Sequence, residues 1–170
     1  QALGAWVRSL DPKQPRYEHH LYEALGAYAT IEVVEPRLLA RLLRAQDPRA
    51  RAFATRIVGR WHDRLDGALD LLAERITDEH LQVRMEAVVA CSAIPSARSI
   101  EVAARAVDAR SDGWIDYALA QAVHRLKPWW MPAFQRGDIA FSRPDQLAFV
   151  LNQTGGRDVL ESLKKLVESG

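Results

Sequence analysis

An internal repeat with a period of about 33 residues constrains the fold of this chain more than any other feature of its sequence. Arg51 matches Arg84, and Ala54 matches Ala87, in both cases at this same spacing. A third copy follows at nearly the same interval without the arginine, and a weaker fourth copy lies upstream. The copies are residues 47–54, 81–87, 115–122 and 18–25. A fixed period of this length is typical of arrays in which similar units stack on one another.

The units are predicted to be helical. Ala, Leu, Arg and Glu dominate, and strict alternation of apolar and polar residues is hard to find. Asp47-Pro48 predicts an N-cap followed by proline at the first helical position, and Glu35-Pro36 and Pro144 open helices in a similar way. We expect breaks at Asp11-Pro12, Pro95, Lys127-Pro128 and Gly155-Gly156. The predicted helices are 2–9, 16–29, 36–45, 48–62, 66–76, 79–93, 97–108, 113–126, 129–136, 144–152 and 157–168.

The repeated pattern has a physical explanation in a known architecture. It resembles the HEAT repeat, in which a small residue lets neighbouring helices approach and an arginine bonds the neighbouring repeat to form a ladder. The predicted structural ladder is Asp47, Arg51, Asp78 and Arg84. We therefore predict an all-α, HEAT-like α-solenoid of stacked helical hairpins, rather than a closed bundle. It forms one domain, 1–170, with units 16–45, 48–76, 79–108 and 113–136 and a C-terminal cap over 138–170.

Composition excludes several classes of function. With 23 basic and 22 acidic side chains, the chain has no overall attraction to nucleic acid or anionic membranes. Its single cysteine, Cys91, excludes an internal disulfide and a zinc site with several thiolates, and is predicted to be buried and inert. No apolar run is long enough to span a bilayer, and the start at Gln1 is expected of an excised or processed piece. We expect no catalytic residue and no cofactor. We also expect no metal site, because His19 and His20 at adjacent helical positions cannot share one ion without a third element.

A more specific resemblance covers roughly residues 15–152. The matching stretches are Tyr17–Leu25, Arg49–Arg56 leading to Trp61, Asp78–Val88, Trp114–Leu119, Leu126–Trp130 and Pro132–Phe134. Their order resembles the HEAT-repeat segment of large secreted or membrane-associated proteins of planctomycete-type bacteria, which also carry a dehydrogenase-like β-propeller and a c-type haem-binding domain. The resemblance implies a periplasmic or extracellular setting and a neighbouring redox domain. The haem motif Cys-x-x-Cys-His is not present here.

One face of the repeat is predicted to be a docking surface. Arg49, Arg56 and Arg60 share one helix face. The positions one and two repeats further along the chain carry apolar and aromatic residues, so these residues should lie in the same row. Such a row has the composition of a protein interface. The predicted partner-binding residues, on the concave side, are Arg56, Arg60, Met85, Val89, Trp114, Tyr117 and Gln121. The alternative is that residues 129–168 fold back and cover them.

The predicted function is a non-catalytic scaffold that docks a protein partner or a neighbouring domain of its parent chain. The alternative is a HEAT-like DNA glycosylase or nucleic-acid-binding module. That enzyme class uses Trp, Asp and Arg side chains in a concave cleft, and Trp114 and Asp116 could imitate them together with three arginines, Arg49, Arg56 and Arg60. The near-neutral charge argues against this alternative, so no nucleic acid and no membrane insertion are expected. The oligomeric state does not follow from the sequence.

Overall fold

The computed structural model describes residues 2–109 and 111–155, and within these ranges every regular element is a helix. The prediction of an all-α fold is therefore confirmed. None of the described helices is long and apolar enough to cross a membrane. The helices are α1 (Ala2–Ser9), α2 (Tyr17–Thr30), α3 (Pro36–Leu42), α4 (Pro48–Arg60), α5 (Ala68–Arg75), α6 (Leu81–Ala93), α7 (Ala97–Ala104), α8 (Gly113–Gln135) and α9 (Pro144–Thr154), with short 3-10 turns η1 (His62–Arg64) and η2 (Arg105–Asp108).

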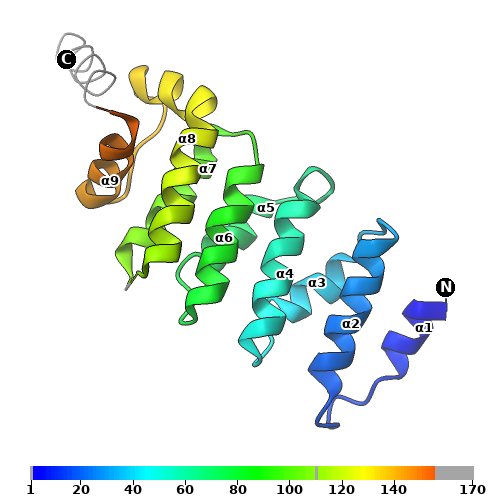
Figure 1. Cartoon of the computed structure of the whole chain (residues 1–170). Coiled ribbons are helices and arrows are strands. Elements are labelled where there is room, and N and C mark those ends of the chain that lie inside the picture. Colours follow the sequence, from blue (N-terminus) through cyan, green and yellow to red (C-terminus); the bar gives the residue numbers. More distant parts are fainter. Residues whose placement is uncertain (1, 110, 156–170) are drawn as a thin grey trace.

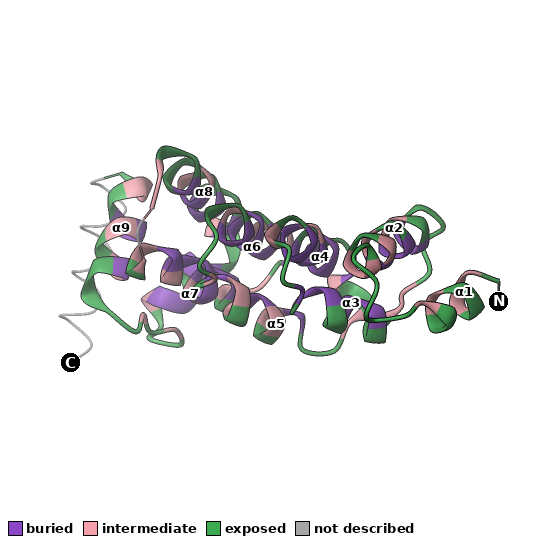
Figure 2. Cartoon of the chain, turned by 90° about the horizontal axis from the view of Figure 1, so that it is seen from below, coloured by how far each residue is buried: buried purple, intermediate pink, exposed green. Residues whose placement is uncertain are grey.

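The helices form two layers of an elongated array. Figure 1 shows α2, α4, α6 and α8 side by side in front of α3, α5 and α7. In Figure 2 the row of α2, α4, α6 and α8 descends toward α4 and rises on both sides, so this layer lies on the hollow side of the array. The core runs between the layers, and α9 packs against α7, η2 and α8 at one end. The predicted helix 157–168 lies outside the described residues.

Asp47 caps α4 as predicted, and Asp112 caps α8, whereas Glu35 and Arg143 give α3 and α9 no side-chain cap. The Asp47 side chain accepts a hydrogen bond from the Arg49 N–H (2.9 Å), with Pro48 at the first helical position of α4. The Asp112 carboxylate accepts from the N–H groups of Trp114 (3.1 Å) and Ile115 (2.9 Å) at the start of α8. These caps satisfy donors that have no partner inside the helix, and they fix where each helix begins.

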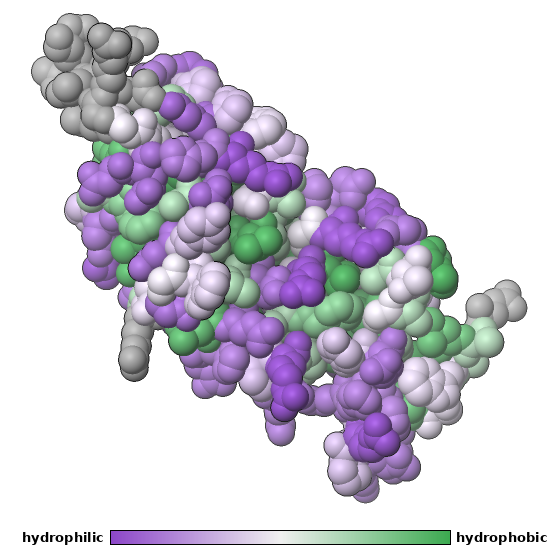
Figure 3. Space-filling view, viewed as in Figure 1, coloured by the Kyte–Doolittle hydropathy of each residue, from purple (hydrophilic) through white to green (hydrophobic). Residues whose placement is uncertain are grey.

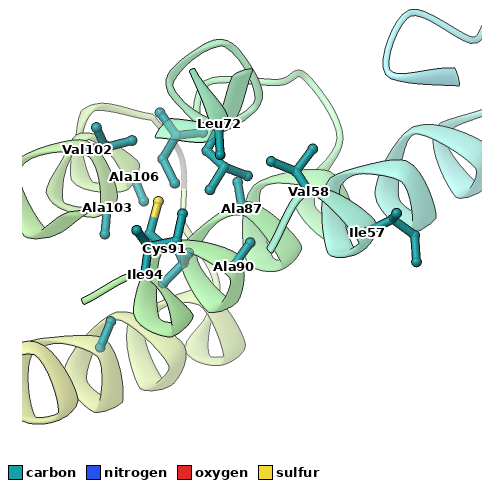
Figure 4. Packing of buried hydrophobic residues seen from close by; sticks show 14 of the residues in the cluster. Ile57, Val58, Leu72, Ala87, Ala90, Cys91, Ile94, Val102, Ala103 and Ala106 are labelled. Carbon is teal, nitrogen blue, oxygen red and sulfur yellow. The ribbon is translucent and has the colours of Figure 1, made fainter. Parts of the chain in front are cut away.

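Small residues let the helices of the front layer approach closely. A Cβ atom added at Gly59 of α4 would lie 2.7 Å from the Cβ of Ala90 on α6, so only glycine fits there. Figure 4 shows this region of the core, with the Cys91 sulfur among small side chains that include Ala103 and Ala106. Burial raises the pKa of the Cys91 thiol to about 12. The thiol is therefore protonated at neutral pH and inert, as predicted.

The arginine ladder joins successive repeats at Arg51. Its guanidinium donates to both carboxylate oxygens of Asp78 (3.0 Å each) and to the carbonyls of Ala45 (2.8 Å) and Gln46 (3.0 Å). The side chains of Arg51 and Asp78 are only 9% and 6% exposed. Arg84, the equivalent residue in the next repeat, is also buried. The Arg51 to Asp78 contact therefore connects the turn of one repeat to the turn of the next.

Asp47 has a different role from the one predicted for it in the ladder. Its carboxylate caps α4, and no arginine of the previous repeat bonds it among the described residues. The upstream copy has Glu18 at the position of the ladder arginine, one repeat before Arg51. The Glu18 carboxylate instead accepts from the backbone N–H groups of Gln46 (2.8 Å) and Asp47 (3.0 Å). The junction between α2 and the start of α4 is thus stabilised by a carboxylate that accepts hydrogen bonds from backbone N–H groups.

The predicted break at Lys127-Pro128 is wrong, because α8 continues to Gln135 with Pro128 and Pro132 inside it. Figure 1 shows that the last part of α8 turns away from the direction of its first part. Each proline lacks an N–H and crowds the preceding turn, which kinks a helix. The buried Trp130 compensates, because it packs into the core and its indole N–H donates to the Val123 carbonyl (3.0 Å).

Candidate functional site

A groove of about 400 Å³ lies on the front layer between α6 and α8. Its α6 wall consists of Met85, Val89 and Ser92, which succeed one another at intervals of four and three positions and so share one helix face. Its α8 wall consists of Trp114, Tyr117, Ala118, Gln121 and Arg125. Five of the seven residues predicted to bind a partner therefore line one groove: Met85, Val89, Trp114, Tyr117 and Gln121.

Large apolar side chains of this groove are exposed to solvent. The exposed fractions are 73% for Trp114, 63% for Tyr117 and 47% for Val89. In the same orientation as Figure 1, Figure 3 shows pale and green atoms among purple ones over the region of α6 and α8. Helix α9, the described part of the predicted cap, packs on α7 and α8 without burying these side chains. An exposed cluster of aromatic and aliphatic side chains is the usual signature of a site that another molecule covers.

A second hollow of about 260 Å³ adjoins the groove at the N-terminal ends of α6 and α8. Met85 and Trp114 line both spaces. The Asp112 cap positions the first turn of α8, and with it the tryptophan. The two hollows thus share the exposed Trp114 in their lining.

A family model described as HEAT repeats matches residues 35–124, more than half of the chain and the segment from the start of α3 into α8. The chain belongs to the HEAT-repeat family. No curated protein matches it. The matched segment of the HEAT array includes every groove residue except Arg125, so the groove belongs to the repeated part of the molecule.

Arg56 and Arg60 do not line the groove of the HEAT array, although they were predicted to act with it. The Arg56 guanidinium binds the carboxylate of Glu86 on α6, through Nε at 3.1 Å and through Nη2. The Glu86 side chain is only 6% exposed. This hydrogen bond raises the pKa of Arg56 above its ordinary value. Arg56 therefore links α4 to α6, and its guanidinium is already paired with the Glu86 carboxylate.

Arg60 points toward the preceding repeat. It binds the Glu32 carboxylate, with Nε at 3.0 Å, and Arg64 binds the other oxygen of that carboxylate at 2.8 Å. Hydrogen bonds from Arg64 and then from Arg60 hold the pKa of Glu32 below its ordinary value. Glu32 adopts a left-handed backbone conformation with φ of 55°, a strained position that its paired side chain and carbonyl stabilise.

The motifs did not predict a role for Glu86, although the sequence carries a signal for it. Glu86 stands between Arg84 and Ala87 on the inner side of α6, where an unpaired carboxylate would be costly. Such a residue requires a cationic partner. Glu32 gave no comparable signal, because it lies in the turn after α2 and its pairing depends on how that turn folds.

The chemistry available in the groove suits binding. Arg125 is the only charged lining residue, and its guanidinium has no ion pair among the residues that the structure describes. Gln121 and Ser92 add polar groups, and the Ser92 hydroxyl already donates to the Val89 carbonyl (2.7 Å). Within the described ranges, no three His, Cys, Asp or Glu side chains come close enough to hold a metal ion. The groove thus combines an apolar floor with one cation at its end.

Proposed function

We propose that this chain is a non-catalytic scaffold that docks an amphipathic helix of a partner protein in the groove between α6 and α8. HEAT repeats generally serve as protein-interaction scaffolds. The observation that carries the proposal is the exposure of Trp114, Tyr117 and Val89 along one groove. Aromatic anchors of this kind contribute about 2 kcal/mol or more each to protein interfaces.

The dimensions and charge of the groove indicate the chemistry of its occupant. Trp114 and Arg125 are eleven positions apart on α8, which corresponds to roughly 16 Å at about 1.5 Å per residue. A partner helix of about three turns covers this length. Its apolar residues at intervals of three and four would contact Trp114, Tyr117 and Val89. An acidic residue at one end would pair with Arg125, which has no ion pair in the described structure.

A display library of random helical peptides, selected against the whole chain, tests this proposal. We expect the selected peptides to be amphipathic, with an acidic residue at one end. Trp114→Ala should weaken their binding by at least about 2 kcal/mol, or about thirtyfold. The same variant should change the free energy of unfolding by less than about 0.5 kcal/mol, because the Trp114 side chain is exposed.

Trp129 provides the matched control. It lies on the same helix and is 43% exposed, but it does not line the groove. Trp129→Ala should leave peptide binding unchanged. The proposal fails if the selected peptides bind Trp114→Ala as tightly as the parent chain, or if that substitution lowers stability by several kcal/mol.

We further propose that the scaffold belongs to a larger redox protein outside the cytoplasm. The support for this is the resemblance of residues 15–152 to the HEAT segment that accompanies a propeller and a c-type haem domain. The reading frame of the parent protein tests it directly. A Cys-x-x-Cys-His motif or a β-propeller beside the repeats would agree with the proposal, and a parent protein with neither would contradict it.

A further inference from the structure

A separate hollow of about 580 Å³ lies at the other end of the array, among α1, α2 and α3. Its apolar wall includes Val7, Leu10 and Leu38. Helix α1 is held against α2 by an edge contact between the rings of Trp6 and His20, whose centroids are 5.9 Å apart. The volume is within the range of about 300 to 1,000 Å³ that small-molecule sites occupy.

Three arginines from two helices line this hollow: Arg8 on α1, and Arg37 and Arg41 on α3. Arg8 and Arg37 have no hydrogen bond or ion pair in the described part of the chain. Glu35 is the one carboxylate of the lining, and it forms no ion pair with them. Three guanidinium groups against one carboxylate give the hollow a net positive charge, which favours an anion.

The hydroxyl of a buried tyrosine faces the same space. Tyr28 is only 9% exposed, yet among the described residues its hydroxyl has no hydrogen-bond partner. A Cβ atom added at Gly4 would lie 3.2 Å from this hydroxyl oxygen and 3.5 Å from Nη1 of Arg8. Glycine at this position therefore keeps the tyrosine hydroxyl and the arginine accessible from the hollow. A polar group that lacks a protein partner in such a place is available to a ligand.

A second tyrosine is positioned to donate as well. The Tyr17 hydroxyl accepts a hydrogen bond from Nη1 of Arg41 at 2.5 Å, which leaves its own proton available for an acceptor. Arg41 in turn retains donors on its other nitrogens. The lining of the hollow thus combines several hydrogen-bond donors with aliphatic side chains.

We propose that this hollow binds a small organic anion with an apolar body, whose carboxylate or phosphate head contacts Arg37, Arg8 and the Tyr28 hydroxyl. The aliphatic part of the ligand lies against Val7 and Leu38. This site is independent of the groove between α6 and α8, which lies farther along the array (Figure 1). The chain would then hold a small ligand beside α1 and a protein helix in the groove.

Calorimetric titration of the whole chain tests the proposal with three probes: hexanoate, hexan-1-ol and inorganic phosphate. Hexanoate should bind more tightly than either of the other two, because only hexanoate combines a charged head with an apolar chain. If hexan-1-ol binds as tightly, the arginines contribute nothing and the proposal is overturned. It is also overturned if phosphate binds as tightly, or if hexanoate does not bind.

Two substitutions locate the site. Tyr28→Phe removes only a hydroxyl that has no partner among the described residues, so the fold should be retained while hexanoate affinity falls about tenfold, equivalent to about 1.4 kcal/mol. Arg37→Gln should weaken hexanoate binding by a similar factor. Arg44 is an exposed arginine outside the hollow, so Arg44→Gln is the matched control and should have no effect. Equal losses in Arg37→Gln and Arg44→Gln would show a general charge effect and overturn the proposal.

Discussion

Replacement of Arg51 with Met removes the guanidinium that joins two repeats while it keeps most of the aliphatic volume. The variant loses two hydrogen bonds to Asp78 and two to backbone carbonyls, and it leaves the Asp78 carboxylate in a position that is 6% exposed. Breaking a buried ion pair costs about 3 to 5 kcal/mol. Asp78 keeps the His80 N–H at 3.0 Å and Arg75 at 3.7 Å, so we expect about 3 kcal/mol, the lower end of this range.

A double-mutant cycle with Asp78→Asn isolates the contact. Urea unfolding followed by far-ultraviolet circular dichroism gives the free energy of each variant. The loss in the double variant should be smaller than the sum of the two single losses by about 2 kcal/mol. Arg49→Met is the control on the same helix, because the Arg49 side chain is 85% exposed, and it should change stability by less than about 0.5 kcal/mol. A coupling below about 0.5 kcal/mol would refute the ladder.

The same pair predicts a dependence of stability on pH. Burial raises the pKa of Asp78, but the hydrogen bonds from Arg51 and the His80 N–H outweigh it and hold this pKa below its ordinary value of 3.8. The stabilisation is therefore complete above the ordinary pKa and is lost as the pH falls through the lowered one. The difference in stability between the parent chain and Asp78→Asn should shrink as the solution is acidified below about pH 4.

Two further predictions concern the ladder and the partner. Arg84→Ala should lower the free energy of unfolding, measured in urea, by about 1 to 3 kcal/mol, because Arg84 is buried at the position equivalent to Arg51. A change within about 0.5 kcal/mol would contradict this prediction. Duplex DNA should bind only weakly in fluorescence anisotropy and should lose no base in a glycosylase assay, because Arg56 and Arg60 are already paired with carboxylates. Tight binding with a steep salt dependence would restore the nucleic-acid alternative.

The repeat period predicted that Arg51 bonds the neighbouring repeat, and Arg51 binds Asp78 there, but Asp47, the other predicted carboxylate, caps α4 instead. The same transfer placed Met85, Val89 and Trp114 in one row across two successive helices, and the structure brings them to one groove. Both inferences depend on transferring positions from one repeat to the next, although the residues at these positions can differ, as Arg56 and Val89 do. The geometry of a regular array converts such positions into neighbours.

The ion pairs of Arg56 and Arg60 could not be obtained in this way. Arg56 and Glu86 do not occupy equivalent positions in their repeats, and their contact depends on the axial offset between α4 and α6. The pairing of Arg60 depends on the left-handed conformation of Glu32 in a turn. Similarly, Lys127-Pro128 predicted a break, whereas α8 continues through Pro128 to Gln135 with Trp130 packed in the core, which the local sequence signal did not reveal.

The repeat also shows how the junction between α6 and α8 differs from the junction between α4 and α6. One repeat after Arg56 the chain has Val89, and one repeat after Glu86 it has Ala118; both line the groove. An ion pair that bridges α4 and α6 is thus replaced between α6 and α8 by an aliphatic and a small residue. The short alanine side chain leaves the space that the longer glutamate fills in the preceding repeat.

This comparison leads to a final prediction, in which the variant Val89→Arg/Ala118→Glu rebuilds the bridge inside the groove. Both positions are at least partly exposed, so the new pair needs little desolvation and should change the free energy of unfolding by less than about 1 kcal/mol. The peptides selected against the parent chain should no longer bind, because the pair occupies their site. Val89→Ala, which keeps the groove open, is the control and should weaken binding much less. Undiminished binding to the double variant would show that the peptides dock elsewhere, and the groove would then lose its assigned role.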